Sequence, residues 1–156
     1  MSAAVLTILL LLAPIQASSK ISASQKQEFL EILTTLPTRG EFYTDDAVQK
    51  AGPYLPVLLS LTEKDVEGHD IYRLAAISRG LCDVEDHREY ASRHFSEIKH
   101  PQLKLLWAAM LFEAGVPSPE TRNFLRIALA SKNQSQLLSD TLGPSFDSFR
   151  DRVLSK

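Results

Sequence analysis

The sequence has little cysteine and glycine, and neither sign of charge is in clear excess. Cys82 is the only cysteine in 156 residues, so no disulfide can form within one chain. The chain has only 6 glycines, and its sequence contains neither the phosphate-binding Walker motif nor the Gly-x-Ser-x-Gly motif of serine hydrolases. The 17 basic and 19 acidic residues are mixed along the chain and give a net charge of −2. No basic segment is present that would attract phosphate backbones, so we expect no nucleic-acid partner.

Charged side chains are also missing from the start of the chain. Residues 1–17 carry none, and the largely apolar run from Ala3 to Ala13 has the length of a signal-peptide core. This run is too short to span about 30 Å of hydrocarbon comfortably. Ala17 supplies the small residue that signal peptidase requires. We therefore expect residues 1–17 to be a signal peptide and residues 18–156 to form a single secreted or periplasmic domain.

Two alternatives to export stay open. Signal peptides usually begin with Lys or Arg, whereas here the first basic side chain is Lys20. The segment could instead be an uncleaved membrane anchor, or the start site could lie too far upstream in a cytosolic protein. We expect contact with a membrane only if the segment is retained.

The rest of the chain is predicted to be all-α. Proline, glycine and capping residues divide it into seven to eight short helices, and no run of residues is typical of a strand. Ser24, with Gln27 three residues later, is predicted to cap the first helix. Thr44, Asp70 and Asp83 are predicted to cap the helices that follow each of them. The later helices are expected at 54–61, 71–82, 84–98, 101–114, 119–131, 134–142 and 146–154.

One segment, residues 101–115, is apolar on nearly every side. Its polar side chains are confined to Gln102, Lys104 and Glu113. A helix of this composition has neighbours on two sides. We therefore expect it in the middle of the fold, with Trp107 enclosed between layers of helices.

Two helices share a short motif. Leu74-Ala75-Ala76-Ile77 and Trp107-Ala108-Ala109-Met110 stand 33 residues apart, and each helix follows a more polar one, 54–61 or 84–98. Paired alanines allow helix backbones to approach closely, and the flanking large side chains fill the space between layers. A repeat of this length is typical of stacked helical hairpins.

The run 54–61 followed by residues 70–77 resembles one unit of the HEAT-like repeat family. Its first helix carries Pro and Leu, and its second has an Arg-Leu-Ala-Ala core. The resemblance covers about residues 54–130 and is clear in two units; 64–68 lengthens the turn of the first. It implies an α-solenoid of stacked antiparallel hairpins that acts as a scaffold for another protein or peptide. An irregular bundle in which two helices share an Ala-Ala pair is the alternative.

Arg73 and Arg79 are the candidate binding residues. Both lie on a predicted inner helix, and inner helices line the concave face where partners of such solenoids dock. Arginine is a frequent anchor of interfaces, although both side chains could instead only cover helix surface with their stems. We expect a non-catalytic protein that binds another protein or peptide. The alternative is a small exported enzyme, or an accessory subunit, that acts on a cell-envelope polymer.

The four histidines do not predict a metal site. His87 and His94 share a helix face but are separated by roughly 10 Å along the axis, too far to hold one ion. His69 and His100 stand at helix starts, where an imidazole is usually solvated or capping. The HExxH and paired CxxC patterns of zinc proteins are missing. We expect no metal and no cofactor.

Two further motifs have structural explanations. Cys82 follows an apolar helical face and is expected to be buried and unreactive, although a thiol–imidazole pair with His87 is conceivable. Asn133-Gln134-Ser135 matches the N-glycosylation motif and is predicted to lie in a loop. Its meaning depends on whether the source is eukaryotic.

Overall fold

The computed structural model describes residues 20–116 and 118–155, and within them the prediction of an all-α chain is confirmed. The predicted signal peptide, residues 1–17, lies outside the described residues and stays a prediction. Eight of the described α-helices have seven residues or more, in agreement with the expected number. The helices are α2 (Ala23–Thr35), α3 (Asp45–Ala51), α4 (Leu55–Ser60), α5 (Glu63–Val66), α6 (Ile71–Cys82), α7 (Glu85–Arg93), α8 (Pro101–Glu113), α9 (Pro119–Ala130), α10 (Lys132–Leu142) and α11 (Phe146–Leu154).

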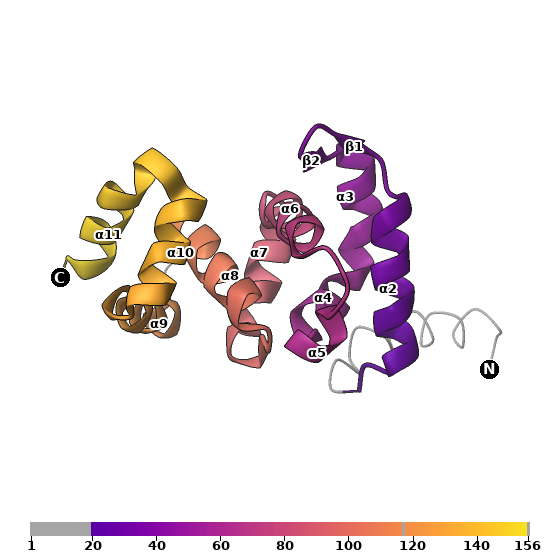
Figure 1. The fold of residues 1–156 in the computed structure, drawn as a ribbon, viewed down its shortest axis with the longest axis horizontal. Helices are drawn as coiled ribbons and strands as arrows, with labels where there is room; N and C mark the ends of the chain where they lie inside the picture. Colours follow the sequence, from indigo (N-terminus) through magenta and orange to yellow (C-terminus); the bar gives the residue numbers. More distant parts are fainter. Residues whose placement is uncertain (1–19, 117, 156) are drawn as a thin grey trace, which may run out of the picture.

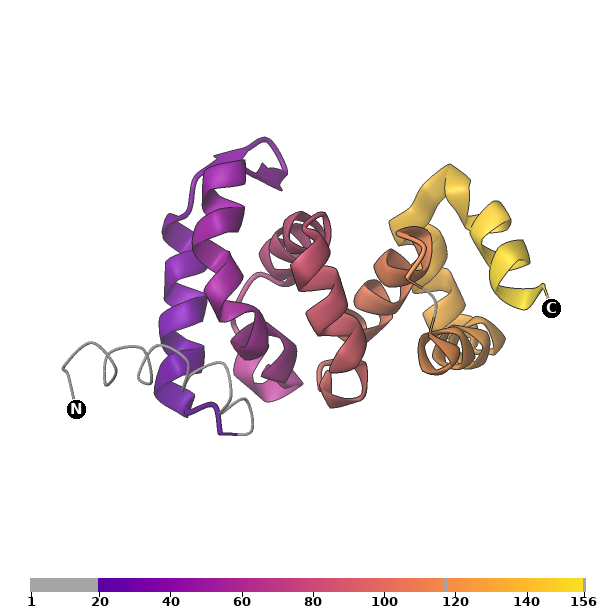
Figure 2. The same ribbon diagram turned by 180° about the vertical axis from the view of Figure 1, so that it is seen from behind.

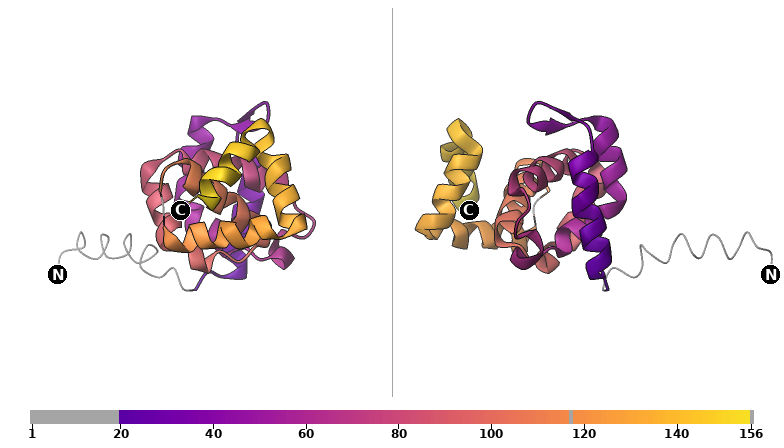
Figure 3. Two further views of the ribbon diagram at one scale, coloured as in Figure 1. Left: turned by 90° about the vertical axis from the view of Figure 1, so that its left-hand side faces the viewer. Right: turned by 45° about the vertical axis from the view of Figure 1, so that its right-hand side comes forward.

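The helices follow one another along the long axis of the molecule. Helices α2 and α3 lie at one end and α10 and α11 at the other, with α6, α7 and α8 between them (Figures 1 and 2). Helix α6 packs against α3 and α8, and α8 packs in turn against α9 and α10. Helices α3, α6, α8 and α10 therefore form a series in which each contacts the next. The oblique view on the right of Figure 3 shows the same order from the N-terminal to the C-terminal helices.

Short elements connect these helices. Two-residue strands β1 (Thr38–Arg39) and β2 (Phe42–Tyr43) form an antiparallel hairpin between α2 and α3, with Gly40 in its turn at a φ of 64°. The Tyr43 hydroxyl donates to the Leu33 carbonyl at 2.9 Å and so fixes the hairpin to α2. The described part of the chain also contains three 3₁₀ turns: η1 (Gly52–Tyr54), η2 (Phe95–Glu97) and η3 (Gly143–Ser145).

Of the four predicted N-caps, Thr44 and Asp70 are confirmed, whereas Ser24 and Asp83 are wrong. The Thr44 hydroxyl accepts from the Ala47 amide at 3.2 Å, and the Asp70 carboxylate accepts from the Tyr72 amide at 2.9 Å. The first helix, however, is capped by Ser22 and not by Ser24. Ser22 forms its own capping box with the glutamine three residues later, and the longer helix lets the preceding isoleucine pack on the core.

The helix predicted at 84–98 corresponds to α7 (Glu85–Arg93), and both its predicted start and its predicted end are corrected. Asp83 does not cap α7, because it continues the helical conformation of α6 as its C-cap, with φ −70° and ψ −15°. An N-cap residue needs an extended conformation, which Val84 adopts instead without a capping side chain. Helix α7 ends at Arg93, and a 3₁₀ turn then carries Phe95 into an edge contact with Phe124 of α9.

The prediction that 101–115 is a central helix is confirmed. Helix α8 contacts α6 and α7 on one side and α9 and α10 on the other. Trp107 is fully buried, at 0% exposure. Among residues 20–116 and 118–155, every helix is too short or too polar to span a lipid bilayer.

Candidate functional site

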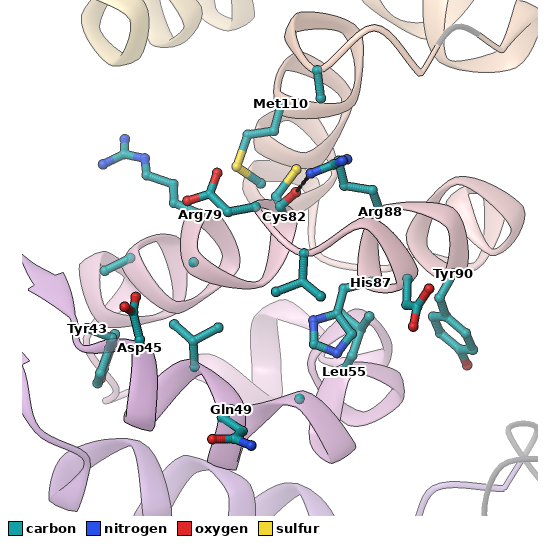
Figure 4. Close-up of a pocket in the computed structure, with 18 of the residues that line it drawn as sticks. Tyr43, Asp45, Gln49, Leu55, Arg79, Cys82, His87, Arg88, Tyr90 and Met110 are labelled. Atoms are coloured by element: carbon teal, nitrogen blue, oxygen red, sulfur yellow. Dashed lines mark hydrogen bonds between the residues drawn. The ribbon is translucent and has the colours of Figure 1, made fainter.

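A pocket of about 1630 Å³ lies where the end of α6 and the start of α7 meet α3, η1 and α8. We call it the α6–α7 pocket. Figure 4 shows that its side chains come from helices that are far apart in the sequence, with Gln49 and Leu55 on one side and Met110 on the other. The lining also contains two large apolar side chains that are exposed to solvent, Phe42 at 59% and Val84 at 40%.

Two glycines allow the helices around this pocket to approach closely. A Cβ atom on Gly80 of α6 would lie 2.5 Å from Cγ2 of Val48 on α3. A Cβ atom on Gly52 would lie 3.0 Å from Cε1 and Nε2 of His87. Glycine in these places therefore brings α3 and η1 against α6 and α7, and the pocket forms at this junction.

The charged side chains of the pocket differ in their pairing. Glu113 pairs with Arg152 of α11, and Arg88 donates to the Cys82 carbonyl at 3.0 Å. Arg79 and Arg93 have no ion-pair partner in the described part of the chain, and the same holds for the carboxylates of Asp45, Asp83 and Asp86. The pocket thus offers unpaired charges of both signs around apolar side chains.

The structure does not bring the two candidate arginines together. Arg79 lines the α6–α7 pocket and is exposed. Arg73 lies outside it: its Nη1 donates to the Leu33 carbonyl at 3.4 Å, and its Nε is 3.9 Å from the Asp70 carboxylate. Burial raises the pKa of the Tyr43 hydroxyl, and the hydrogen bond with Arg73 partly offsets that effect. Arg73 therefore helps to join α6 to α2 and β2, and a binding role for either arginine stays a prediction.

Cys82 is buried, as predicted, at 6% exposure. Burial raises the pKa of its thiol to about 11, although the positive charge of Arg88 acts in the opposite direction. The thiol is therefore protonated at neutral pH, where a protonated sulfur is a poor nucleophile. His87 also lines the pocket, but among the described residues its Nδ1 has no hydrogen-bond partner and no hydrogen bond joins it to Cys82.

The remaining histidines are dispersed. His94 pairs with Glu97 at 2.7 Å and stacks on Tyr90, and His69 is exposed. His100 caps α8, one of the two roles expected for it: its Nδ1 accepts from the Leu103 amide at 3.4 Å. Within residues 20–116 and 118–155, no three His, Cys, Asp or Glu side chains are placed to hold a metal ion together.

The predicted loop position of the glycosylation motif is wrong. Asn133 is exposed but lies in the first turn of α10, which begins at Lys132. Ser131 ends α9 and is also the N-cap of α10, so a single residue joins the two helices and no loop separates them.

Of the residues that line this pocket, sequence analysis proposed only Arg79 as a binding residue and considered Cys82 and His87 as a conceivable thiol–imidazole pair. The exposed apolar side chains Phe42 and Val84 were not proposed as part of a site. Phe42 belongs to no periodic pattern, and the helical spacing of Val84 assigned it to the apolar face of the helix predicted at 84–98, whereas the structure leaves it 40% exposed. The only sequence signal that could have pointed to these two side chains is a large apolar residue beside a turn. Comparison with known proteins adds no family to this picture, since no family model, no curated protein and no solved structure matches the chain.

Proposed function

We propose that the chain is an exported, non-catalytic helical-repeat protein that binds another protein or peptide in the α6–α7 pocket. A HEAT-like stack is supported by the order of contacts, because α3, α6, α8 and α10 each pack on the next. In such a stack, alternate helices build a continuous surface on which a partner docks. Fold alone is a weak argument for function, so the pocket carries the proposal.

The observation that carries it is the size and chemistry of the pocket. Its volume of about 1630 Å³ exceeds the roughly 300–1,000 Å³ of typical small-molecule sites, and so suits a chain segment. Two large apolar side chains are exposed in it, and burying such side chains against a partner stabilises a complex. Arg79 is free to pair with a partner carboxylate at its edge.

Arg79→Glu and Arg73→Glu make a matched pair of variants on one helix. Peptides would be selected from a display library on the wild-type protein. They would then be titrated calorimetrically into the wild type and into each of the two variants. We expect Arg79→Glu to weaken binding by at least tenfold, equivalent to about 1.4 kcal/mol, and Arg73→Glu to leave it nearly unchanged. Equal effects of the two variants, or no selectable peptide, would overturn the proposal.

A second pair of variants tests the apolar contribution separately. Val84→Asp changes an exposed side chain inside the pocket, whereas Ile127→Asp changes one on α9, outside it, at 64% exposure. We expect binding to fall only with Val84→Asp. Thermal unfolding of both variants controls for loss of the fold.

A further inference from the structure

His100 occupies a buried position at the start of the central helix. It is 6% exposed and is the N-cap of α8. Its Nδ1 accepts the Leu103 amide at 3.4 Å, while its carbonyl accepts the Lys104 amide at 2.8 Å. A ring nitrogen can accept a hydrogen bond only when it carries no proton. This cap therefore exists only with a neutral imidazole.

The imidazole borders a second pocket, of about 640 Å³, between α5 and the start of α8. The charged groups that line this pocket are Glu63, Lys64 and Glu67, and Lys99 is adjacent to His100 in the chain. Solvent protons can reach the ring through this pocket. Burial lowers the pKa of His100, and the nearby carboxylate of Glu63 offsets that effect only in part.

We propose that His100 is a pH-sensitive cap that keeps the first turn of α8 closed beside this pocket at neutral pH and releases it in acid. When the ring takes up a proton, Nδ1 no longer accepts from Leu103, and a positive charge lies in a buried position. If the first turn of α8 opens toward the pocket, water can reach both the unpaired Leu103 amide and the charged imidazole, and both costs are removed. Because α8 contacts α6, α7, α9 and α10, the change occurs at the centre of the stack.

The direction of the pH dependence follows from the lowered pKa. Above the ordinary histidine value of about 6.5, the imidazole is neutral in both the closed and the open state, and the cap is intact. Below it, the open state binds a proton that the closed state does not bind. Opening is therefore favoured as the pH falls from about 6.5 through the pKa of the closed state, and it increases no further below that value.

Native-state hydrogen exchange on the whole protein tests this directly. The amides of Leu103 and Lys104 report on the first turn, and the amide of Trp107 reports on the middle of the same helix. After correction for intrinsic exchange, we expect the opening constant of the first turn to rise about tenfold for each pH unit between the two pKa values. The amide of Trp107 should show no such rise.

Two variants separate this effect from general acid sensitivity. His100→Asn keeps a side chain that can cap a helix but does not titrate in this range, so its opening constant should not vary with pH. His69→Asn removes an exposed histidine and should behave like the wild type. An equal pH response in His100→Asn and wild type would overturn the proposal. Should His100→Asn not fold, an NMR titration of the wild type decides: His100 must titrate below the ordinary histidine value of about 6.5, and a value at or above it would contradict the proposal.

Discussion

The close approach of α3 and α6 at Gly80 makes a sharp prediction about stability. A glycine inside a helix costs about 1 kcal/mol relative to alanine, so Gly80→Ala would be stabilising if space were available. Here the new Cβ would lie 2.5 Å from Cγ2 of Val48. Val48 is on α3, 8% exposed, and a β-branched side chain in a helix has one strongly preferred rotamer. It cannot easily move away.

The clash should outweigh the gain in helix propensity. Overpacking a core costs about 1–3 kcal/mol, so Gly80→Ala is expected to lower the free energy of unfolding by about 1 kcal/mol net. Chemical denaturation with circular dichroism measures this difference. The control is the same substitution in a Val48→Ala background, where Cγ2 is absent.

In the Val48→Ala background, the effect of Gly80→Ala on the free energy of unfolding should change sign. Without the valine methyl groups, Gly80→Ala should raise the free energy of unfolding by up to about 1 kcal/mol, because only the propensity term remains. If Gly80→Ala is equally stabilising in both backgrounds, the helices do not meet at this glycine, and the account of the α3–α6 contact fails.

Two other predictions concern ionisable groups. At pH 8, Cys82 should react with a thiol reagent far more slowly in the native protein than in the unfolded chain, and the native rate should rise as the pH nears 11. A fast reaction of the native protein at pH 8 would contradict the burial of this thiol. The Lys26 ammonium and the Thr62 amide donate hydrogen bonds to the Asp65 carboxylate at 2.8 and 2.9 Å. Burial raises the pKa of Asp65, but these bonds outweigh that effect and hold the pKa below 3.8. Lys26→Met should therefore reduce stability by about 1 kcal/mol at pH 7 and have no effect once Asp65 is protonated, which thermal unfolding between pH 2 and 7 measures. A difference that does not shrink as the pH falls from 7 to 2 would show that the ion pair is not its cause.

Local chemistry made much of the fold predictable. Asp70 caps a helix that runs to Cys82, and Gly115 ends α8 with a φ of 73°, because these residues act through bonds to their own neighbours. The nearly all-apolar composition around Trp107 predicted burial for the same reason: little of that helix can face water. Such features need no knowledge of distant segments.

Other features depended on choices that the local sequence leaves open. Ser22 and Ser24 each have a glutamine three residues later, so the capping pattern alone could not decide between them. Helix α5 was missed although Thr62 and Asp65 form a capping box, because one turn leaves no periodic pattern. The hairpin around Gly40 has only two-residue strands, which are too short to show alternation.

The candidate site was the least predictable part. The α6–α7 pocket exists because helices that are distant in the chain meet at Gly52 and Gly80. Nothing next to these glycines in the sequence indicates which side chains would face them. Arg79 could be proposed from its place on an inner helix, but that argument applied equally to Arg73, which the fold uses to join α6 to α2.

Trp107 provides the most direct test of the layered architecture, since it is the only tryptophan in the chain. We expect native fluorescence to come from the fully buried indole of Trp107 on α8, with blue-shifted emission and little quenching by acrylamide until the protein unfolds. Native emission at the wavelength of the unfolded chain, with full access to the quencher, would contradict the central position of α8 and the docking surface inferred from it.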